Sequence, residues 1–110
     1  MKPKNVVTML VCPENPDNIG AAARAVKNMG FSELRLVDPP ADWRLKGKKM
    51  AMSAADTLAR ARVFPDLRKA SADLQLLIGT TRRASRGRGT FLDFPRAVAR
   101  VRKDSERIKI

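Results

Sequence analysis

The stretch NPDNIGAAARAVKNMG, residues 15–30, joins turn-forming residues to a helical pattern directly after an apolar run. The residue types and spacing of Asn18, Gly20 and Arg24 suit the binding of an anion and the stabilisation of negative charge. A guanidinium donates charge-assisted hydrogen bonds to phosphate and alkoxide oxygens, and a glycine lets a backbone or a ligand approach closely. We expect Asp17 or Asn18 to cap the helix. The stretch therefore predicts an anion-binding helix N-terminus in which Arg24 is the candidate for a direct role.

The helical period fixes where Arg24 lies. At about 100° per residue, Arg24 is roughly 160° from the centre of the apolar stripe that runs from Ile19 to Met29. Lys27 and Asn28 share its polar side. An arginine in this place is either a solvated surface residue or a residue that contacts a ligand, and the helical pattern alone leaves both readings open.

The residue types that are missing restrict the chemistry. The chain has no histidine and no tyrosine, which removes the usual general base and most zinc sites. Cys12 is the single cysteine, so neither an internal disulfide nor a cysteine metal cluster can form. We interpret Cys12 as a small buried residue and expect a reducing, cytoplasmic location. No signal peptide and no membrane-spanning stretch is expected.

The charge of the chain points to a class of partner. A length of 110 residues fits one domain, and the formal net charge is +12. Such an excess predicts attraction to polyanions, with nucleic acid ahead of anionic membranes. The alternative is a charged surface that only keeps the protein in solution.

Strand-like and helix-like segments alternate along the chain. We expect strands over residues 5–12, 34–38, 62–64 and 74–81, with the first and last buried on both faces. We expect helices over residues 19–29, 49–61, 65–74 and 93–106, and the start of another strand at 107–110. This order predicts an α/β fold with a mostly parallel sheet and helices on both faces.

Two basic segments are interpreted as loops. The segment 82–89 carries four arginines among small residues, namely Arg82, Arg83, Arg86 and Arg88. It suits contact with an RNA backbone, and a merely solvated charge run is the alternative. The segment 41–49 is also basic, and its Trp43 either stacks on a base or packs against the sheet.

The segments PENPDNIGAAARAVKNMGF, LRLVDP and LLIGTTRR occur in this order and spacing. Together they resemble the SpoU/TrmH-type SPOUT methyltransferases, most nearly the TrmJ group, from about residue 5 to residue 110. The resemblance implies transfer of a methyl group from S-adenosylmethionine to a ribose 2′-hydroxyl of RNA, with tRNA as the expected substrate. It also implies a trefoil-knotted α/β fold and a homodimer with the active site at the subunit interface.

The resemblance assigns roles to particular residues. Arg24 matches the catalytic arginine of the family, and Asn18 matches its companion polar position. The segment that borders the methyl donor corresponds to Thr80, Thr81 and Arg82. Expected RNA contacts are Arg83, Arg86, Arg88 and Lys27.

The sequence departs from the family pattern at its end. A Gly/Glu-rich loop and a Ser-Leu-Asn segment, which supply most of the cofactor pocket and the knot in the family, do not occur in these 110 residues. We therefore expect a single domain that is truncated before the knotted segment.

Two roles are considered for Arg24: a general base that removes the proton of the ribose hydroxyl, and a charged group that orients the nucleotide. A guanidinium stays protonated at neutral pH and is a poor general base. We favour a role in which Arg24 orients the nucleotide phosphate and stabilises the developing alkoxide.

Two alternatives to an enzyme are considered for the whole chain. One is a non-catalytic, basic RNA-binding α/β module, and the other is an assembly protein for ribonucleoproteins.

Overall fold

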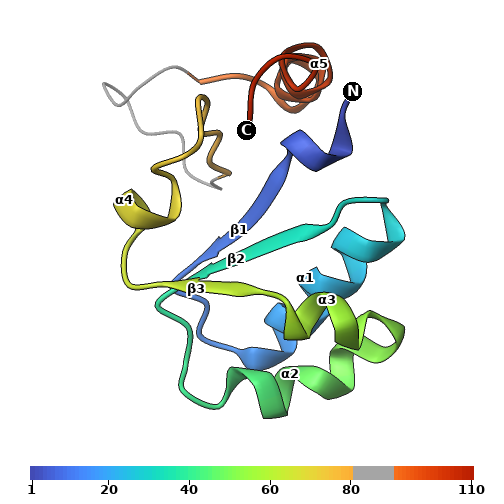
Figure 1. Cartoon of the computed structure of the whole chain (residues 1–110), viewed down its shortest axis with the longest axis vertical. Coiled ribbons are helices and arrows are strands. Elements are labelled where there is room, and N and C mark those ends of the chain that lie inside the picture. Colours follow the sequence, from blue (N-terminus) through green and yellow to red (C-terminus); the bar gives the residue numbers. More distant parts are fainter. Residues whose placement is uncertain (81–90) are drawn as a thin grey trace.

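The computed structural model describes residues 1–80 and 91–110. Its centre is a parallel sheet of three strands in the order β1 (Val7–Val11), β2 (Glu33–Val37) and β3 (Arg62–Phe64), as Figure 1 shows. Met9 of β1 is paired with Arg35 of β2, and Arg35 is paired with Arg62 of β3. The parallel α/β fold predicted from the alternating pattern is confirmed.

Three helices cover one face of the sheet: α1 (Pro16–Asn28), α2 (Trp43–Ala51) and α3 (Ala55–Ala59). A short 3-10 turn, Met52–Ala54, joins α2 to α3. Leu34 and Leu36 of β2 point to these helices, since alternate residues of a strand face the same side. The buried core on this face consists of Ile19, Ala23, Val26, Leu34, Leu36, Trp43, Ala51, Ala54, Leu58 and Ala61.

The other face of the sheet is covered unevenly. The four-residue helix α4 (Leu67–Ala70) and the turn after it lie over β2 and β3, so helices are present on both faces as predicted. The β1 side is more open, and Val11 is 52% exposed. The prediction that 5–12 is a strand buried on both faces is therefore wrong for its second face. Cys12 is exposed, contrary to our expectation, because it follows the last residue of β1 at the edge of the sheet.

Local chemistry explains where α1 begins and ends. The side chain of Asn15 accepts a hydrogen bond from the backbone N–H of Asp17, and Pro16 occupies the first helical position. The expected caps Asp17 and Asn18 are thus wrong, because both already lie inside the helix. Gly30 has a φ of 81° just beyond the end of the helix, the left-handed conformation in which a glycine commonly ends a helix.

The segment 41–49, interpreted as a basic loop, is mostly helical. Residues 43–51 form α2, because arginine, lysine and leucine are good helix formers and Gly47 is buried against α1. The helix ends where Met52 takes a φ of 50°. The predicted helix over 49–61 is therefore divided into the end of α2, a 3-10 turn and α3.

The C-terminal part differs most from expectation. The predicted helix over 93–106 is present as α5 (Phe94–Asp104), which is capped by the side chain of Asp93, and Phe94 at its start is 79% exposed. Residues 74–80 do not form a strand. In the described part of the chain their main-chain hydrogen bonds are a turn bond from the N–H of Leu74 to the carbonyl of Ser71 at 3.0 Å and a bond from the N–H of Gln75 to the carbonyl of Lys109 at 2.9 Å.

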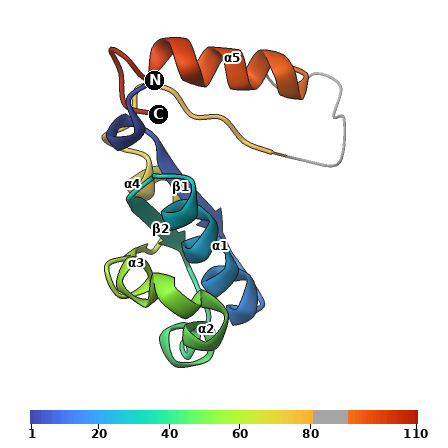
Figure 2. The same cartoon turned by 90° about the vertical axis from the view of Figure 1, so that its right-hand side faces the viewer.

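Residues 107–110, expected to start a strand, are not a strand in the structure, but Ile110 pairs with the chain at the start of β1. The N–H of Ile110 donates to the carbonyl of Asn5 at 2.7 Å, and the N–H of Val7 donates to the carbonyl of Ile110 at 2.6 Å. This is the bond pattern of parallel strands. Figure 2 shows the C-terminus beside the N-terminal 3-10 turn Pro3–Asn5, with α5 lying across this end of the molecule.

No helix among residues 1–80 and 91–110 is long and apolar enough to cross a membrane. The same residues contain no cluster of His, Cys, Asp and Glu side chains that suits a metal ion.

Candidate functional site

Gly20 and Arg24 are one helical turn apart on α1, and the structure gives each a different task. Gly20 is fully covered by α2, and a Cβ atom at this position would overlap the carbonyl oxygen of Gly47. Gly20 therefore allows the close approach of a backbone, one of the two possibilities that the sequence left open. Because residues four apart share a helix face, Arg24 lies one turn further along α1 than the contact between Gly20 and α2.

Arg24 is exposed, and in the described part of the chain its guanidinium has no ion-pair partner. The orientation predicted from the helical period, away from the core, is confirmed. Asn18 is also exposed, but it lies about 120° from Arg24 around the helix. Neither residue lines the cavity beside Asp38 or the cavity beside Lys103. The two side chains are thus available to a ligand without forming a closed site together.

Lys27 is tied to the protein's own chain. Its ammonium donates to the carbonyl of Ser53 at 3.0 Å and to Asp56 Oδ1 at 2.9 Å. The hydrogen bond from Lys27 lowers the pKa of the Asp56 carboxyl from its ordinary value. Lys27 therefore joins α1 to α3, and an RNA contact by this residue has to compete with this ion pair.

The predicted donor-bordering segment lies at the edge of the described residues. Thr80 is exposed and lines neither cavity. The other residues expected to contact the donor or RNA lie outside the described residues, namely Thr81, Arg82, Arg83, Arg86 and Arg88.

Trp43 is buried at the start of α2 with 6% of its surface exposed. The guanidinium carbon of Arg44 lies 4.8 Å from the centroid of the Trp43 ring system. Of the two readings that the sequence allowed for Trp43, packing within the protein is the one observed. What remains of its surface helps to line a cavity at the carboxyl edge of the sheet.

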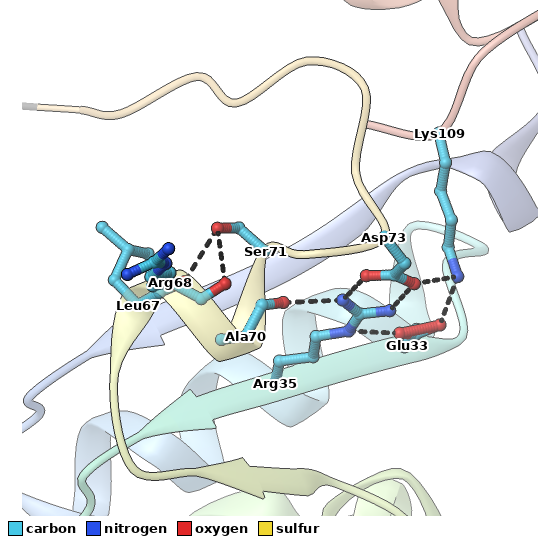
Figure 3. A network of polar contacts seen from close by, with 8 residues as sticks. All are labelled: Glu33, Arg35, Leu67, Arg68, Ala70, Ser71, Asp73 and Lys109. Atoms are coloured by element: carbon cyan, nitrogen blue, oxygen red, sulfur yellow. Dashed lines mark hydrogen bonds and ion pairs between the residues drawn. The ribbon is translucent and has the colours of Figure 1, made fainter.

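The second face of the sheet contains an ionic cluster around a buried arginine that sequence reasoning missed, shown in Figure 3. Arg35 of β2 is 1% exposed and donates from Nε to Glu33 Oε2 at 2.6 Å and from Nη2 to Asp73 Oδ2 at 2.8 Å. Its Nη1 donates to the carbonyl of Ala70 at 2.7 Å. Lys109 Nζ lies 3.2 Å from Asp73 Oδ2 and 3.5 Å from Glu33 Oε1. The cluster holds α4, the turn after it and the C-terminal segment against β2.

The hydrogen bonds of this cluster shift the ionisation of its members. The bond to Asp73 raises the pKa of Arg35 against the opposing effect of burial, and the bond from Arg35 lowers the pKa of Asp73. An arginine between two leucines in a strand that is otherwise apolar, as in LRLV, is the sequence signal that could have found the cluster.

Comparison with known proteins adds the family. Residues 5–101 match the SpoU rRNA Methylase family, and this range contains Asn18, Gly20 and Arg24. The chain belongs to the SpoU methylase family. The resemblance found in the sequence is confirmed.

Relatives of this SpoU chain carry names that mention RNA. It is 39% identical over 79 residues to the uncharacterized tRNA/rRNA methyltransferase LasT of Escherichia coli, covering 72% of this chain and 35% of LasT. It is 41% identical over 91 residues to the tRNA (cytidine/uridine/adenosine-2′-O-)-methyltransferase TrmJ of Pseudomonas aeruginosa, covering 83% of this chain and 35% of TrmJ. The chain thus spans about a third of the length of these relatives.

Solved structures agree with the fold of the SpoU chain. A putative methylase family protein from Neisseria gonorrhoeae superposes with a TM-score of 0.79 at 29% identity, over 96% of this chain and 58% of that one. TrmJ from Z. mobilis superposes with a TM-score of 0.56 at 40% identity, over 62% of this chain and 31% of that one.

Proposed function

We propose that this chain takes part in an S-adenosylmethionine-dependent RNA 2′-O-methyltransferase, with tRNA as the substrate class. The observation that carries the proposal is the family match over residues 5–101, which includes the Asn18–Arg24 element. The net charge of +12 supports a polyanionic substrate. The exposure of Arg24, without an ion-pair partner among the described residues, leaves its guanidinium free to meet a phosphate.

The methyl donor does not fit the described residues by themselves. An adenosyl group needs a concave site, and Thr80, the described residue expected beside it, is exposed and lines neither the cavity at Asp38 nor the one at Lys103. We therefore assign no step to the donor here. When bound, S-adenosylmethionine would supply an electrophilic methyl group.

Arg24 has the position and chemistry of a residue that orients RNA. It projects from a helix whose backbone is fixed by the Gly20–Gly47 contact, so the base of its side chain is held rigidly. A guanidinium on a rigid helix can hold a phosphate by paired hydrogen bonds and place the neighbouring ribose. Its fixed positive charge would then stabilise the negative charge that develops on the 2′-oxygen as the proton leaves.

The open arrangement of Asn18 and Arg24 is consistent with a site shared between two subunits. We propose a homodimer in which the partner subunit closes the surface around Arg24. Sedimentation of the purified protein tests this: a dimer at micromolar concentration is expected, and a monomer under the conditions in which methyl transfer occurs would contradict it.

Replacement of Arg24 tests the proposed activity. The protein is incubated with tRNA and methyl-labelled S-adenosylmethionine, and nuclease digestion then shows whether the label is on a ribose 2′-oxygen. Arg24→Ala should lower kcat/KM by about 100-fold or more, since a charge that acts in the transition state is removed. Arg24→Lys should recover part of the rate, because the charge returns without the paired geometry.

The matched control is Arg68→Ala, which removes an exposed arginine from α4. Its methyl transfer and its thermal unfolding should equal those of the unaltered protein. Transfer by Arg24→Ala at the control rate would contradict the assignment. RNA binding without any donor binding or methyl transfer would support the non-catalytic RNA-binding module instead.

A further inference from the structure

A cavity of about 450 Å³ lies at the carboxyl edge of the sheet, where β2 and β3 end. Figure 1 shows the segments that follow these two strands leaving the sheet at this edge. The edge is where open parallel sheets bind ligands, and the volume lies within the range of small-molecule sites. The lining residues are Asp38, Pro39, Pro40, Ala41, Trp43, Val63, Phe64 and Pro65.

The side chains that line this open cavity are apolar apart from the exposed Asp38. Prolines and aromatic rings present rigid surfaces that suit a planar ring, whereas Asp38 is the one charged residue among the lining residues. The backbone of Asp38 is fixed, because its N–H donates to the carbonyl of Phe64 at 2.9 Å and its φ is 47°. In the described part of the chain the Asp38 carboxylate has neither an ion-pair nor a hydrogen-bond partner.

Two arginines stand beside the aromatic rings of the lining. The guanidinium carbon of Arg44 lies 4.8 Å from the centroid of Trp43, and that of Arg62 lies 5.1 Å from the centroid of Phe64. Neither arginine forms an ion pair within the described residues. The open cavity thus combines proline, aromatic and aliphatic side chains, a single exposed carboxylate and two nearby positive charges.

We propose that this cavity binds an unpaired guanine nucleotide of an RNA strand. The base packs against the apolar lining, Asp38 accepts hydrogen bonds from it, and Arg44 and Arg62 attract the adjoining phosphate. This binding role rests on the RNA substrate class of the proposed function, and it adds a contact that lies apart from Arg24.

The choice of guanine follows from donor and acceptor chemistry. An ionised carboxylate only accepts hydrogen bonds, so it needs neighbouring donors. Guanine presents two adjacent donors on its pairing edge, the ring N1–H and the exocyclic amino group. Adenine and cytosine present an amino group beside a ring nitrogen that repels a carboxylate, and uracil presents one N–H between two carbonyls. Asp38 therefore favours guanine over the other three bases.

Fluorescence of Trp43 reports directly on the cavity, because the chain has one tryptophan and no tyrosine. The four nucleoside 5′-monophosphates are titrated separately, with excitation at the red edge of the indole band to avoid absorption by the bases. GMP should change the emission in a saturable way and bind at least fivefold more tightly than UMP. No saturable change with GMP up to about 10 mM, or equal affinity for all four, would overturn the proposal.

Substitutions separate the base contact from the phosphate contact. Asp38→Asn keeps the shape and tolerates the positive φ, and it should weaken GMP binding about tenfold and abolish the preference for guanine. Arg44→Ala should weaken GMP binding but leave guanosine binding unchanged. The matched charge control is Arg102→Ala on α5, which should bind GMP as the unaltered chain does. Undiminished GMP binding by Asp38→Asn would overturn the role of the carboxylate.

Oligonucleotides distinguish an RNA strand from a free nucleotide. A short oligouridine with one central guanosine should bind more tightly than GMP, and oligouridine alone should bind more weakly than the guanosine-containing strand. A guanosine strand that binds no better than GMP would overturn the RNA part of the proposal and indicate a free nucleotide. If the protein does not discriminate between the two strands but still transfers methyl groups, the guanine-binding role of the cavity is refuted and the proposed function is not. If the protein binds no RNA at all, the proposed function is refuted.

Discussion

Arg24 and Arg35 show what two environments do to the same side chain. Arg24 is exposed on a helix and available to a ligand, whereas Arg35 is buried in a strand and uses its donors within the protein. The helical angle was sufficient to predict the exposure of Arg24. One acceptor, Glu33, is two residues from Arg35, but the other two, Ala70 and Asp73, are more than 30 residues away in sequence and nothing local indicates them. The sequence was therefore sufficient to predict a role for Arg24, whereas the cluster around Arg35 became evident only in the structure.

Removal of Arg35 should destabilise the protein strongly. Arg35→Ala leaves the carbonyl of Ala70 without its donor, removes the hydrogen bonds to Glu33 and Asp73, and opens a cavity in the second face. We expect the free energy of unfolding to fall by about 3 kcal/mol, measured by urea denaturation. Arg60→Ala, which removes an arginine whose side chain is 66% exposed, should change it by less than about 0.5 kcal/mol. Equal stability of the two variants would contradict the structural role of Arg35.

The lowered pKa of Asp73 predicts an acid-dependent loss of stability. Its hydrogen bond from Arg35 stabilises the ionised form in the folded state, so this contribution is present above about pH 4, the ordinary range of an aspartate. It is lost as the pH falls toward the lower folded-state pKa. Asp73→Asn should therefore unfold with a weaker pH dependence between about pH 4 and pH 2 than the unaltered protein. The effect is reduced because the side chain of Asp73 is 49% exposed.

Among the elements, those with strong local signals were predicted well. The strand β2 has a core face of leucines, α1 has a clear period and a glycine stop, and α5 begins at a capping aspartate. The helix α2 was missed because its charge and Gly47 suggested a loop, although Gly47 serves the packing against α1. The segment 74–80 has the composition of a strand, but strand formation needs a paired neighbour, and a single sequence does not show which neighbour it has.

The contact between α1 and α2 should be sensitive to one methyl group. In Gly20→Ala the new Cβ meets the backbone of Gly47, which cannot move aside as a side chain can. We expect a loss of about 2 kcal/mol in the free energy of unfolding, although alanine is the better helix former. Gly79→Ala is the control, since its Cβ would meet no atom within 4 Å. A Gly20→Ala variant as stable as this control would show that the two helices separate easily.

At the scale of the whole molecule, the candidate site has parts that a sequence shows and parts that it hides. The Asn18–Arg24 motif, the net positive charge and the family can all be read from the sequence itself. The cavity at Asp38 does not, because it arises from two segments that meet only when β2 and β3 pair. Ligand sites at the ends of parallel strands generally depend on such meetings.

The net charge predicts a strong effect of salt on RNA binding. Each phosphate that a basic residue neutralises releases about 0.7–0.9 counterions, so the affinity for tRNA should fall steeply as salt rises. The dissociation constant is measured by filter binding between about 50 and 200 mM salt, and it should rise at least tenfold if three or more phosphates are contacted. A constant affinity across this range would indicate that the positive charge only solvates the protein.

The ionic cluster around Arg35 also bears on how the molecule responds to heat. The cost of removing charged groups from water falls as temperature rises, because their hydration carries an unfavourable entropy. A network of four charged side chains therefore gains weight, relative to apolar packing, as the melting range is approached. It follows that α4 and the segment around Lys109 should be among the last parts to leave the sheet in a hot solution.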